Sequence, residues 1–237
     1  MSDNTRLQQI RENERKSHIA MYSDSELYQE GSWLRKPIKT VLDLLPYFES
    51  KDDVRVLDLG CGVGRNCISI AKHLQNIPCC IDCVDILDLA IIKLKDYAEK
   101  YGVSESIHGI VSPIEGFLIP KNHYDWILAV SSLEHIDSEG SFIKKLSEIR
   151  DGLRSNGIVT LVINSDVREY ETATNTAVPA QFEVNLPTVK LLELLENTFA
   201  GWSILKSTVR QQHYEIPREC GICELHTSVV SFAARKS

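Results

Sequence analysis

The chain has 237 residues, of which 43% are hydrophobic and 25% charged, and its formal net charge is -7. These values are typical of a globular domain with one sizeable core, which excludes a disordered or fibrous chain. An acidic chain is a poor electrostatic partner for nucleic acid or for an anionic membrane. No apolar run approaches the roughly 20 residues of a membrane span. Residues 1–20 lack the apolar centre of a signal peptide, so we expect a cytoplasmic protein.

Residues 1–36 are polar with scattered aromatic side chains, and we expect them to form a helical extension ahead of a main domain, residues 37–237. From Pro37 apolar residues recur at helical spacing, and Pro46 predicts the end of that helix. Short apolar runs then alternate with segments of helical periodicity, which is typical of a parallel sheet covered on both faces. The expected strands are 54–59, 79–86, 107–111, 126–130 and 158–163, and the expected helices are 65–74, 88–101, 141–153 and 187–199.

The carboxy-terminal part departs from this alternation. Two apolar runs, 202–210 and 226–233, follow each other with no helix between them, which predicts an antiparallel pair. We therefore predict an α/β fold, a Rossmann-like doubly wound sheet of seven strands with the last one antiparallel, preceded by an N-terminal helical lid. Residues 166–186 are polar and long for a connection in such a sheet, so we expect an insert on the substrate side.

A glycine-rich loop follows the first strand. Asp58 is followed by Gly60, Gly62 and Gly64, and the glycines allow the backbone to approach a ligand at the start of a helix. The position of the third glycine in a dinucleotide fingerprint is occupied by Arg65. An acid at the strand end suits a ligand with an ammonium group better than a pyrophosphate. Asp85 ends the second strand, where a carboxylate accepts hydrogen bonds from a ribose.

At these residues the chain resembles the class I S-adenosylmethionine-dependent methyltransferases. Residues 124–136 resemble the fourth-strand segment of the small-molecule branch, and Gly64-Arg65-Asn66 resembles the tellurite-resistance methyltransferases. The resemblance implies S-adenosyl-L-methionine as cofactor and S-adenosyl-L-homocysteine as product. The implied cofactor-binding residues are Asp58, Gly60, Cys61, Gly62, Gly64, Asn66, Asp85, Ile86, Ser112, Ile114, Val130 and Ser131.

Each of these residues has an implied role. Asp58, the glycine loop and the backbone of Val130 and Ser131 would hold the methionine end, and Asp85 would hold the ribose. The side chains that would line the adenine are Ile86, Ser112 and Ile114. Two alternatives remain open: Asp58 could instead organise the loop through backbone N–H groups, and Asp85 could be an exposed strand end.

The sequence offers few candidates for catalysis. Methyl transfer needs a base only if the acceptor arrives protonated, and the candidates are His135 and Tyr170. Arg168 could bind an anionic substrate, and Tyr28 and Trp33 would border the substrate if residues 19–34 fold over the site as a lid. His135 and Trp33 also have structural interpretations, as packing side chains.

The acceptor is the least certain part of the function. Residues 130–133 lack the Asn/Asp-Pro-Pro-Tyr segment of base methyltransferases, which together with the negative charge favours a small-molecule substrate over nucleic acid. The alternatives are a protein or tRNA methyltransferase and a non-catalytic S-adenosylmethionine-binding protein. We expect a monomer or homodimer with no membrane partner.

The seven cysteines include two C-x-x-C pairs, Cys80/Cys83 and Cys220/Cys223. Positions three apart in a strand face opposite sides, so the first pair cannot converge on one metal ion. The second pair precedes the last strand and could form a local redox or metal site. We expect no bound metal.

Overall fold

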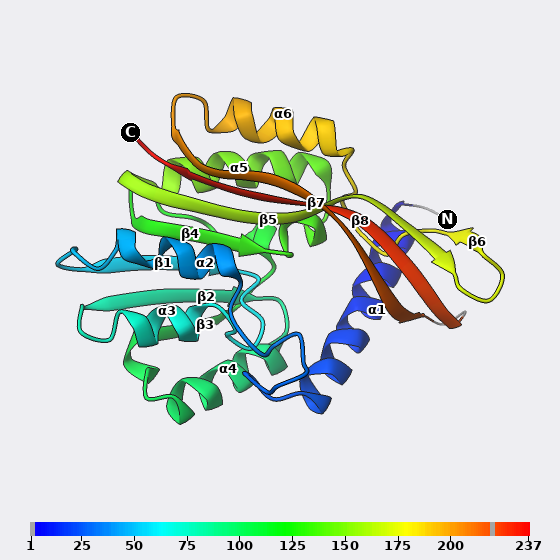
Figure 1. The fold of residues 1–237 in the computed structure, drawn as a ribbon, viewed down its shortest axis with the longest axis horizontal. Helices are drawn as coiled ribbons and strands as arrows, with labels where there is room; N and C mark the ends of the chain where they lie inside the picture. The colour runs from blue at the N-terminus through cyan, green and yellow to red at the C-terminus, as the bar shows by residue number, and fades with distance from the viewer. Residues whose placement is uncertain (1–2, 219–220) are drawn as a thin grey trace.

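The computed structural model describes residues 3–218 and 221–237, which form one mixed sheet with helices on both faces (Figure 1). The strands are β1 Val54–Leu59, β2 Cys79–Asp85, β3 Ile107–Val111, β4 Tyr124–Val130, β5 Leu153–Glu171, β6 Thr176–Val178, β7 Ser203–Arg218 and β8 Gly221–Arg235. The α-helices are α1 Asp3–Asp24, α2 Lys39–Leu44, α3 Cys67–His73, α4 Asp88–Lys100, α5 Glu139–Gly152 and α6 Thr188–Thr198. Single 3-10 turns span Leu45–Tyr47, Ser104–Ser106, Ile114–Gly116 and Leu133–His135.

The sheet has the order β3-β2-β1-β4-β5-β8-β7, with β6 paired to β5 outside this path. Strands β1 to β5 are parallel, and β8 runs antiparallel to both of its neighbours. The predicted α/β doubly wound sheet with a reversed last strand is therefore confirmed. The described part of the sheet differs from the prediction in one strand, because the short β6 adds an eighth.

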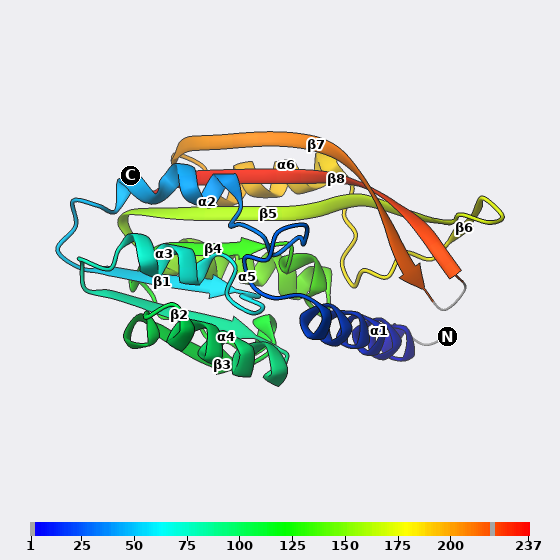
Figure 2. The same cartoon turned by 60° about the horizontal axis from the view of Figure 1, so that its bottom comes forward.

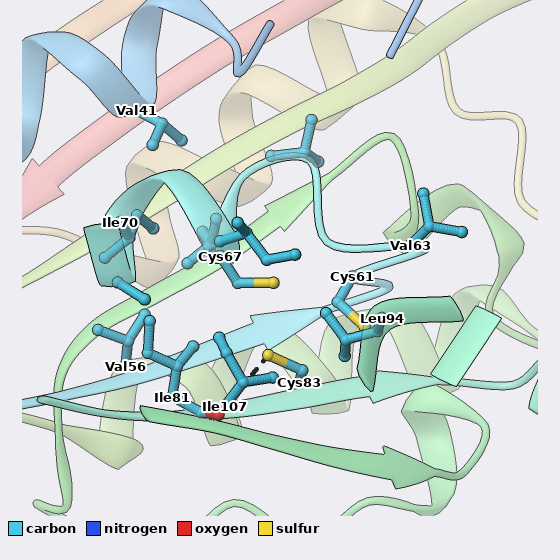
Figure 3. Packing of buried hydrophobic residues seen from close by; sticks show 14 of the residues in the cluster. Val41, Val56, Cys61, Val63, Cys67, Ile70, Ile81, Cys83, Leu94 and Ile107 are labelled. Carbon is cyan, nitrogen blue, oxygen red and sulfur yellow. Dashed lines mark hydrogen bonds between the residues drawn. The ribbon is translucent and has the colours of Figure 1, made fainter. Parts of the chain in front are cut away.

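Two apolar layers cover the two faces of the sheet. On one face α2, α3 and α4 cover an apolar layer that includes Trp126, whose ring stacks on that of Phe48 with centroids 4.7 Å apart. Figure 3 shows part of this layer, with Cys61, Cys67 and Cys83 among the buried side chains. On the other face α5 and α6 cover a second layer. Every residue of β4 is buried, which explains why the central strands have continuous apolar sequences.

Strands β5, β7 and β8 extend beyond the carboxyl edge of the parallel sheet and, together with β6, form what we call the arm (Figure 2). The arm consists of residues 166–171, 176–178, 210–218 and 221–226. Its own small core contains Val167, Phe182 and Leu225. The predicted insert 166–186 is therefore partly strand, and β5, β7 and β8 are longer than their apolar runs indicated. A half-solvated antiparallel ribbon tolerates alternating polar residues, so the strand ends were not visible in the sequence.

Helix α1 contacts the arm and the loops beside it through polar side chains. The Arg6 guanidinium donates to the Phe182 carbonyl at 3.2 Å, and Arg11 pairs with Glu115 at 2.5 Å. Arg218 of β7 bridges Glu14 of α1 and Glu169 of β5, at 3.4 and 2.9 Å. The N-terminal extension is thus helical over Asp3–Asp24, and its contacts are mainly ionic, which agrees with its polar composition.

Candidate active site

The glycine loop turns sharply at the carboxyl end of β1. Gly60 and Gly62 have positive φ angles of 74° and 54°, which L side chains rarely adopt. A Cβ on Gly60 would lie 2.3 Å from the Cβ of Ser132, and one on Gly62 would lie 2.7 Å from the Tyr22 hydroxyl. The loop is therefore closely covered on both sides, and only glycine fits at these two positions.

Asp58 lies beneath this loop and is 1% exposed. Neither of its carboxylate oxygens has a hydrogen-bond partner within residues 3–218 and 221–237. Burial, together with the negative charge of Asp85, raises the pKa of Asp58 from 3.8 to about 7, and the nearby Arg65 guanidinium and Cys67 thiol oppose the rise. A loop-organising role for Asp58 is not supported, because such a role requires bonds to backbone N–H groups. Its carboxylate is instead available to a cationic group.

Asp85 at the end of β2 is held rigidly. Its Oδ2 accepts from the Gly62 N–H at 2.8 Å, and its Oδ1 accepts from the Leu87 N–H at 2.9 Å. Burial raises the pKa of Asp85, and these backbone bonds counteract the rise. Each oxygen keeps a second lone pair for a ligand hydroxyl. The adjacent Ile86 is 50% exposed, which leaves an apolar surface beside the carboxylate.

The residues that follow β4 and β3 lie beside the glycine loop at the carboxyl edge of the sheet. Ser131 has a positive φ of 51°, and its N–H donates to the Val162 carbonyl at 2.7 Å. Ser132 donates to the Leu59 carbonyl at 2.7 Å, which fixes the end of β4 to the end of β1. Ile114 is buried close to Gly60, in the 3-10 turn that follows Ser112. The structure therefore brings together most of the residues that the resemblance implied.

Three predicted cofactor residues already have other contacts. Asn66 is buried and its Oδ1 accepts from the Ile38 N–H at 3.2 Å, so its side chain joins the loop to the segment before α2. Ser112 donates to the neighbouring Pro113 carbonyl at 3.0 Å. The Cys61 thiol is buried, and burial raises its pKa. Their contact with a cofactor stays a prediction.

The segment after α1 covers the glycine loop. Tyr22, at the end of α1, is buried over Gly62, and Trp33 stacks on it with ring centroids 6.4 Å apart. The Arg65 guanidinium lies 5.1 Å from the Trp33 ring centroid and donates to the Trp33 carbonyl at 3.1 Å. Tyr28 donates to the Arg65 carbonyl at 3.0 Å. Trp33 is 44% exposed and Tyr28 is half-buried, so Trp33 has the more open ring of the two.

Comparison with known proteins agrees with this geometry. Residues 56–157 match the model of a methyltransferase domain family. This match identifies residues 56–157 as a methyltransferase domain. The part of the methyltransferase domain matched by the family model runs from β1 into β5 and includes the glycine loop, Asp85 and Ser131.

Individual relatives are distant. An uncharacterized protein of Methanocaldococcus jannaschii is 31% identical over 52% of this chain and 47% of its own length. Ajmaline N-methyltransferase of Rauvolfia serpentina is 19% identical over 70% of this chain and 57% of its own length. The chain thus spans about half the length of the curated relatives it matches. The structure of TehB from Haemophilus influenzae is similar with a TM-score of 0.63, at 18% identity, covering 84% of this chain and 62% of that one. That structural likeness concerns the fold alone.

His135 is an ion-paired side chain in this methyltransferase domain. Its Nδ1 lies 2.8 Å from a carboxylate oxygen of Glu183, and its ring stacks on Phe182. Burial opposes protonation, but the hydrogen bond with Glu183 and the charges of Glu134 and Glu14 raise the pKa of His135 to about 9. The imidazolium form therefore prevails at neutral pH. This geometry disfavours His135 as a general base and favours a fixed positive charge.

Arg168 and Tyr170 lie on the face of the arm that points away from the glycine loop. The β-ladder pairs Arg168 with His226 and Tyr170 with Glu224, while Glu169 between them pairs with Leu225. Leu225 shares its face with Val229, which packs in the layer that contains Cys61 and Val63 of the glycine loop. The register shift between Ser165 and Arg168 decides this orientation. The structure does not bring Arg168 and Tyr170 to the cofactor residues.

Sequence reasoning missed several residues of the site. Tyr22 was one of several aromatics in a polar segment, and only its place over Gly62 distinguishes it. Glu134 is fully buried, and its Oε1 accepts from the N–H and the side-chain amide of Asn164. Glu183 was hidden in the polar insert. Glu134 lies within the segment 124–136 named in the sequence analysis, but no motif links it to Tyr22 or Glu183, because their contacts join segments that are far apart in the sequence.

Two cavities lie outside this edge of the sheet. One of ≈ 610 Å³ is lined by Val54, Cys79 and Cys80 at the amino end of β1 and β2. Another of ≈ 430 Å³ lies between Tyr28 and Lys72. Neither is lined by Asp58 or Asp85, so the chemistry of the loop, rather than the cavity volume, locates the candidate site.

The structure also locates the first cysteine pair and shows whether any helix could span a membrane. Cys83 is buried on β2 and Cys80 is partly exposed on the same strand. Cys220 lies outside the described residues, so the Cys220/Cys223 pair stays a prediction. Within the described parts of the chain, every helix is too short or too polar to cross a membrane.

Proposed function

We propose that the protein transfers a methyl group from S-adenosyl-L-methionine to a small-molecule acceptor. The single observation that carries this proposal is the Asp58 carboxylate, which is buried and without a hydrogen-bond partner in the described structure, directly beneath the glycine loop. Such a group is costly in an isolated fold, and a bound ammonium group would satisfy it. Relatives that carry a methyltransferase domain support the same cofactor.

The residues present fit this cofactor. Asp58 would face the methionine ammonium, and the free lone pairs of Asp85 would accept from the two ribose hydroxyls. Exposed Ile86 and the buried Ile114 would lie against the adenine. The positive φ at Gly62 places backbone rather than a side chain beside the ligand.

The chain's own residues would orient the reactants and exclude water. When bound, the cofactor supplies a methyl group that its sulfonium already activates, so alignment and desolvation provide most of the rate enhancement. Protonated His135 would stay fixed at this edge by its pair with Glu183, which balances its charge, and would position the residues around it. We retain His135 as a candidate on this basis, as a positioning group rather than a base.

Several features support a small acceptor. Helix α1 contacts the arm through the Arg218–Glu14 pair and the neighbouring loops through Arg11, so both elements border the carboxyl edge of the sheet. The net charge of -7 disfavours a tRNA substrate. Ajmaline N-methyltransferase, one of the relatives, is named for a small-molecule substrate. A protein substrate would instead require an exposed groove beside the glycine loop.

We also propose that residues 1–36 act as a lid over the site. Tyr22 over Gly62 and Trp33 over Arg65 support this role. Deleting the segment would also remove Leu27 and Leu34 from the core, so point variants are the better test. The lid predicts that Trp33 fluorescence changes when S-adenosyl-L-homocysteine binds. An unchanged spectrum at saturation would contradict it.

A substrate panel tests the proposed activity. The full chain is incubated with S-adenosyl-L-methionine and small amines, phenols, thiols and metalloid oxyanions, and released S-adenosyl-L-homocysteine is measured. The matched control is Asp85→Ala, which removes the proposed ribose contact, with circular dichroism as the check that the variant folds. Turnover with one acceptor class that the control lacks supports the proposal. Tight cofactor binding without turnover on any small acceptor, but with turnover on a protein or tRNA extract, would contradict the small-molecule acceptor.

A further inference from the structure

Two histidines and two glutamates meet on the outer face of the arm. His213 and Glu215 alternate on β7, and Glu224 and His226 alternate on β8. The ladder pairs His213 directly with His226, and Glu215 directly with Glu224. All four side chains therefore point to the same face, and they form two adjacent cross-strand rows. This face is the one that carries Arg168 and Tyr170, away from the glycine loop.

The spacing of three of these side chains matches a metal site. One ligand atom from each of His213, Glu224 and His226 lies within 4.8 Å of the other two. The Glu224 carboxylate oxygen is 3.2 Å from His226 Nε2 and 3.9 Å from His213 Nδ1. Ligand atoms around a tetrahedral zinc ion lie about 3.3 Å apart, given zinc–ligand distances of about 2.0 Å. Small rotations of the three side chains would therefore bring their ligand atoms to the separations found around zinc.

The ladder also creates a repulsion that a cation would remove. Glu215 and Glu224 are directly opposite each other, and like charges in such a pair destabilise a sheet. Of the charged groups on the neighbouring strand β5, Arg168 pairs with His226 and adds one positive charge to this face. The two carboxylates, Glu215 and Glu224, give this face two negative charges beside the imidazole donors, which still attract a divalent ion past one arginine.

We propose that His213, Glu224 and His226 bind one divalent cation of the zinc class, with a solvent molecule as the fourth ligand and Glu215 as a second negative charge beside the site. Imidazole and carboxylate donors in a four-coordinate arrangement suit Zn²⁺ and, as a spectroscopic substitute, Co²⁺. The ion joins β7 to β8 and so stiffens the arm, which extends beyond the rest of the sheet (Figure 2). This site is separate from the cofactor residues, and its existence does not depend on the proposed function.

Titration of the full-length, chelator-treated protein with Co²⁺ tests the site. The visible absorption of Co²⁺ should saturate at one equivalent with the intensity of a four-coordinate site, and Zn²⁺ should displace it. The variants His213→Ala, Glu224→Gln and His226→Ala should each weaken binding about tenfold or more. His73→Ala is the matched control, because His73 forms an exposed 2.7 Å pair with Glu49 on another part of the chain.

The outcomes separate the proposal from weak surface binding. One saturable equivalent that is lost in the three variants and kept in the His73→Ala control supports it. Absence of a saturable equivalent, or equal loss in the control, overturns it. If His226→Ala fails to fold, the exposed His213 and Glu224 variants decide the matter, with circular dichroism as the check on folding. S-adenosyl-L-homocysteine affinity should stay unchanged in His213→Ala, since the site faces away from the glycine loop.

Discussion

Replacing Asp58 by asparagine should change stability and cofactor binding in opposite directions. The pKa of Asp58 rises from 3.8 to about 7 because the carboxylate is buried. A pKa unit corresponds to about 1.36 kcal/mol, so ionised Asp58 costs about 4 kcal/mol of stability above pH 7. Asp58→Asn should therefore raise the free energy of unfolding of the cofactor-free protein by about 2–4 kcal/mol at pH 8, after allowance for the buried amide. The same change should weaken S-adenosyl-L-homocysteine binding about tenfold or more.

The free energy of unfolding should depend on pH through Asp58, in a direction that its raised pKa determines. Between pH 3.8 and about 7 the folded protein holds a proton on Asp58 that the unfolded chain has released. Stability should therefore fall as the pH rises through this window, and Asp58→Asn should remove that part of the slope. Urea denaturation at several pH values measures both quantities.

Asp125 provides the matched control for this substitution. It is as buried as Asp58, but its carboxylate accepts from Lys51 at 2.8 Å, from Arg154 at 2.9 Å and from the Arg55 N–H at 2.9 Å. Asp125→Asn should therefore destabilise the protein, with the opposite sign. If Asp58→Asn also destabilises, or if it binds S-adenosyl-L-homocysteine as tightly as the native chain, the role given to Asp58 is wrong.

Two further predictions concern the cover of the loop and the ion pair beside it. Gly62→Ala should destabilise the fold by about 1–2 kcal/mol, because of the positive φ at this position and a clash of the new Cβ with the Tyr22 hydroxyl. Tyr22→Phe in the same chain should relieve part of that loss. A double-mutant cycle without coupling would show that the two residues do not touch. The pair of His135 with Glu183 adds stability that is full below pH 6.5 and is lost as the pH rises through about 9. Glu183→Gln should therefore lower the free energy of unfolding by about 2–3 kcal/mol near neutral pH and lower the pKa of His135, which NMR titration measures. An unchanged pKa of His135 would contradict the pairing.

The central part of the fold could be predicted because local patterns determine it. The strand–loop–helix around Gly60, the carboxylate of Asp85 and the reversed last strand all follow from spacing and apolar runs. The parallel strands are buried on both faces, so their sequences differ clearly from the flanking helices. The methyltransferase domain was recognisable from these residues.

The arm could not be predicted, because its strands are half-solvated and polar. The register shift between Ser165 and Arg168 turns Arg168 and Tyr170 away from the cofactor residues, and no sequence pattern shows such a shift. The pairing of His135 with Glu183 depends on how residues 179–187 fold back. The meeting of His213 with His226 likewise depends on the register of β7 and β8.

Calorimetric titration of the native chain and of Asp85→Ala with S-adenosyl-L-homocysteine tests the central claim most directly. The account predicts micromolar binding to the native chain. Loss of the ribose contact should cost roughly 1.5–3 kcal/mol, or about tenfold to a hundredfold in affinity, with an unchanged circular dichroism spectrum. Equal affinity in the two proteins would place the ribose elsewhere, and no binding by the native chain would contradict the proposed methyltransferase activity.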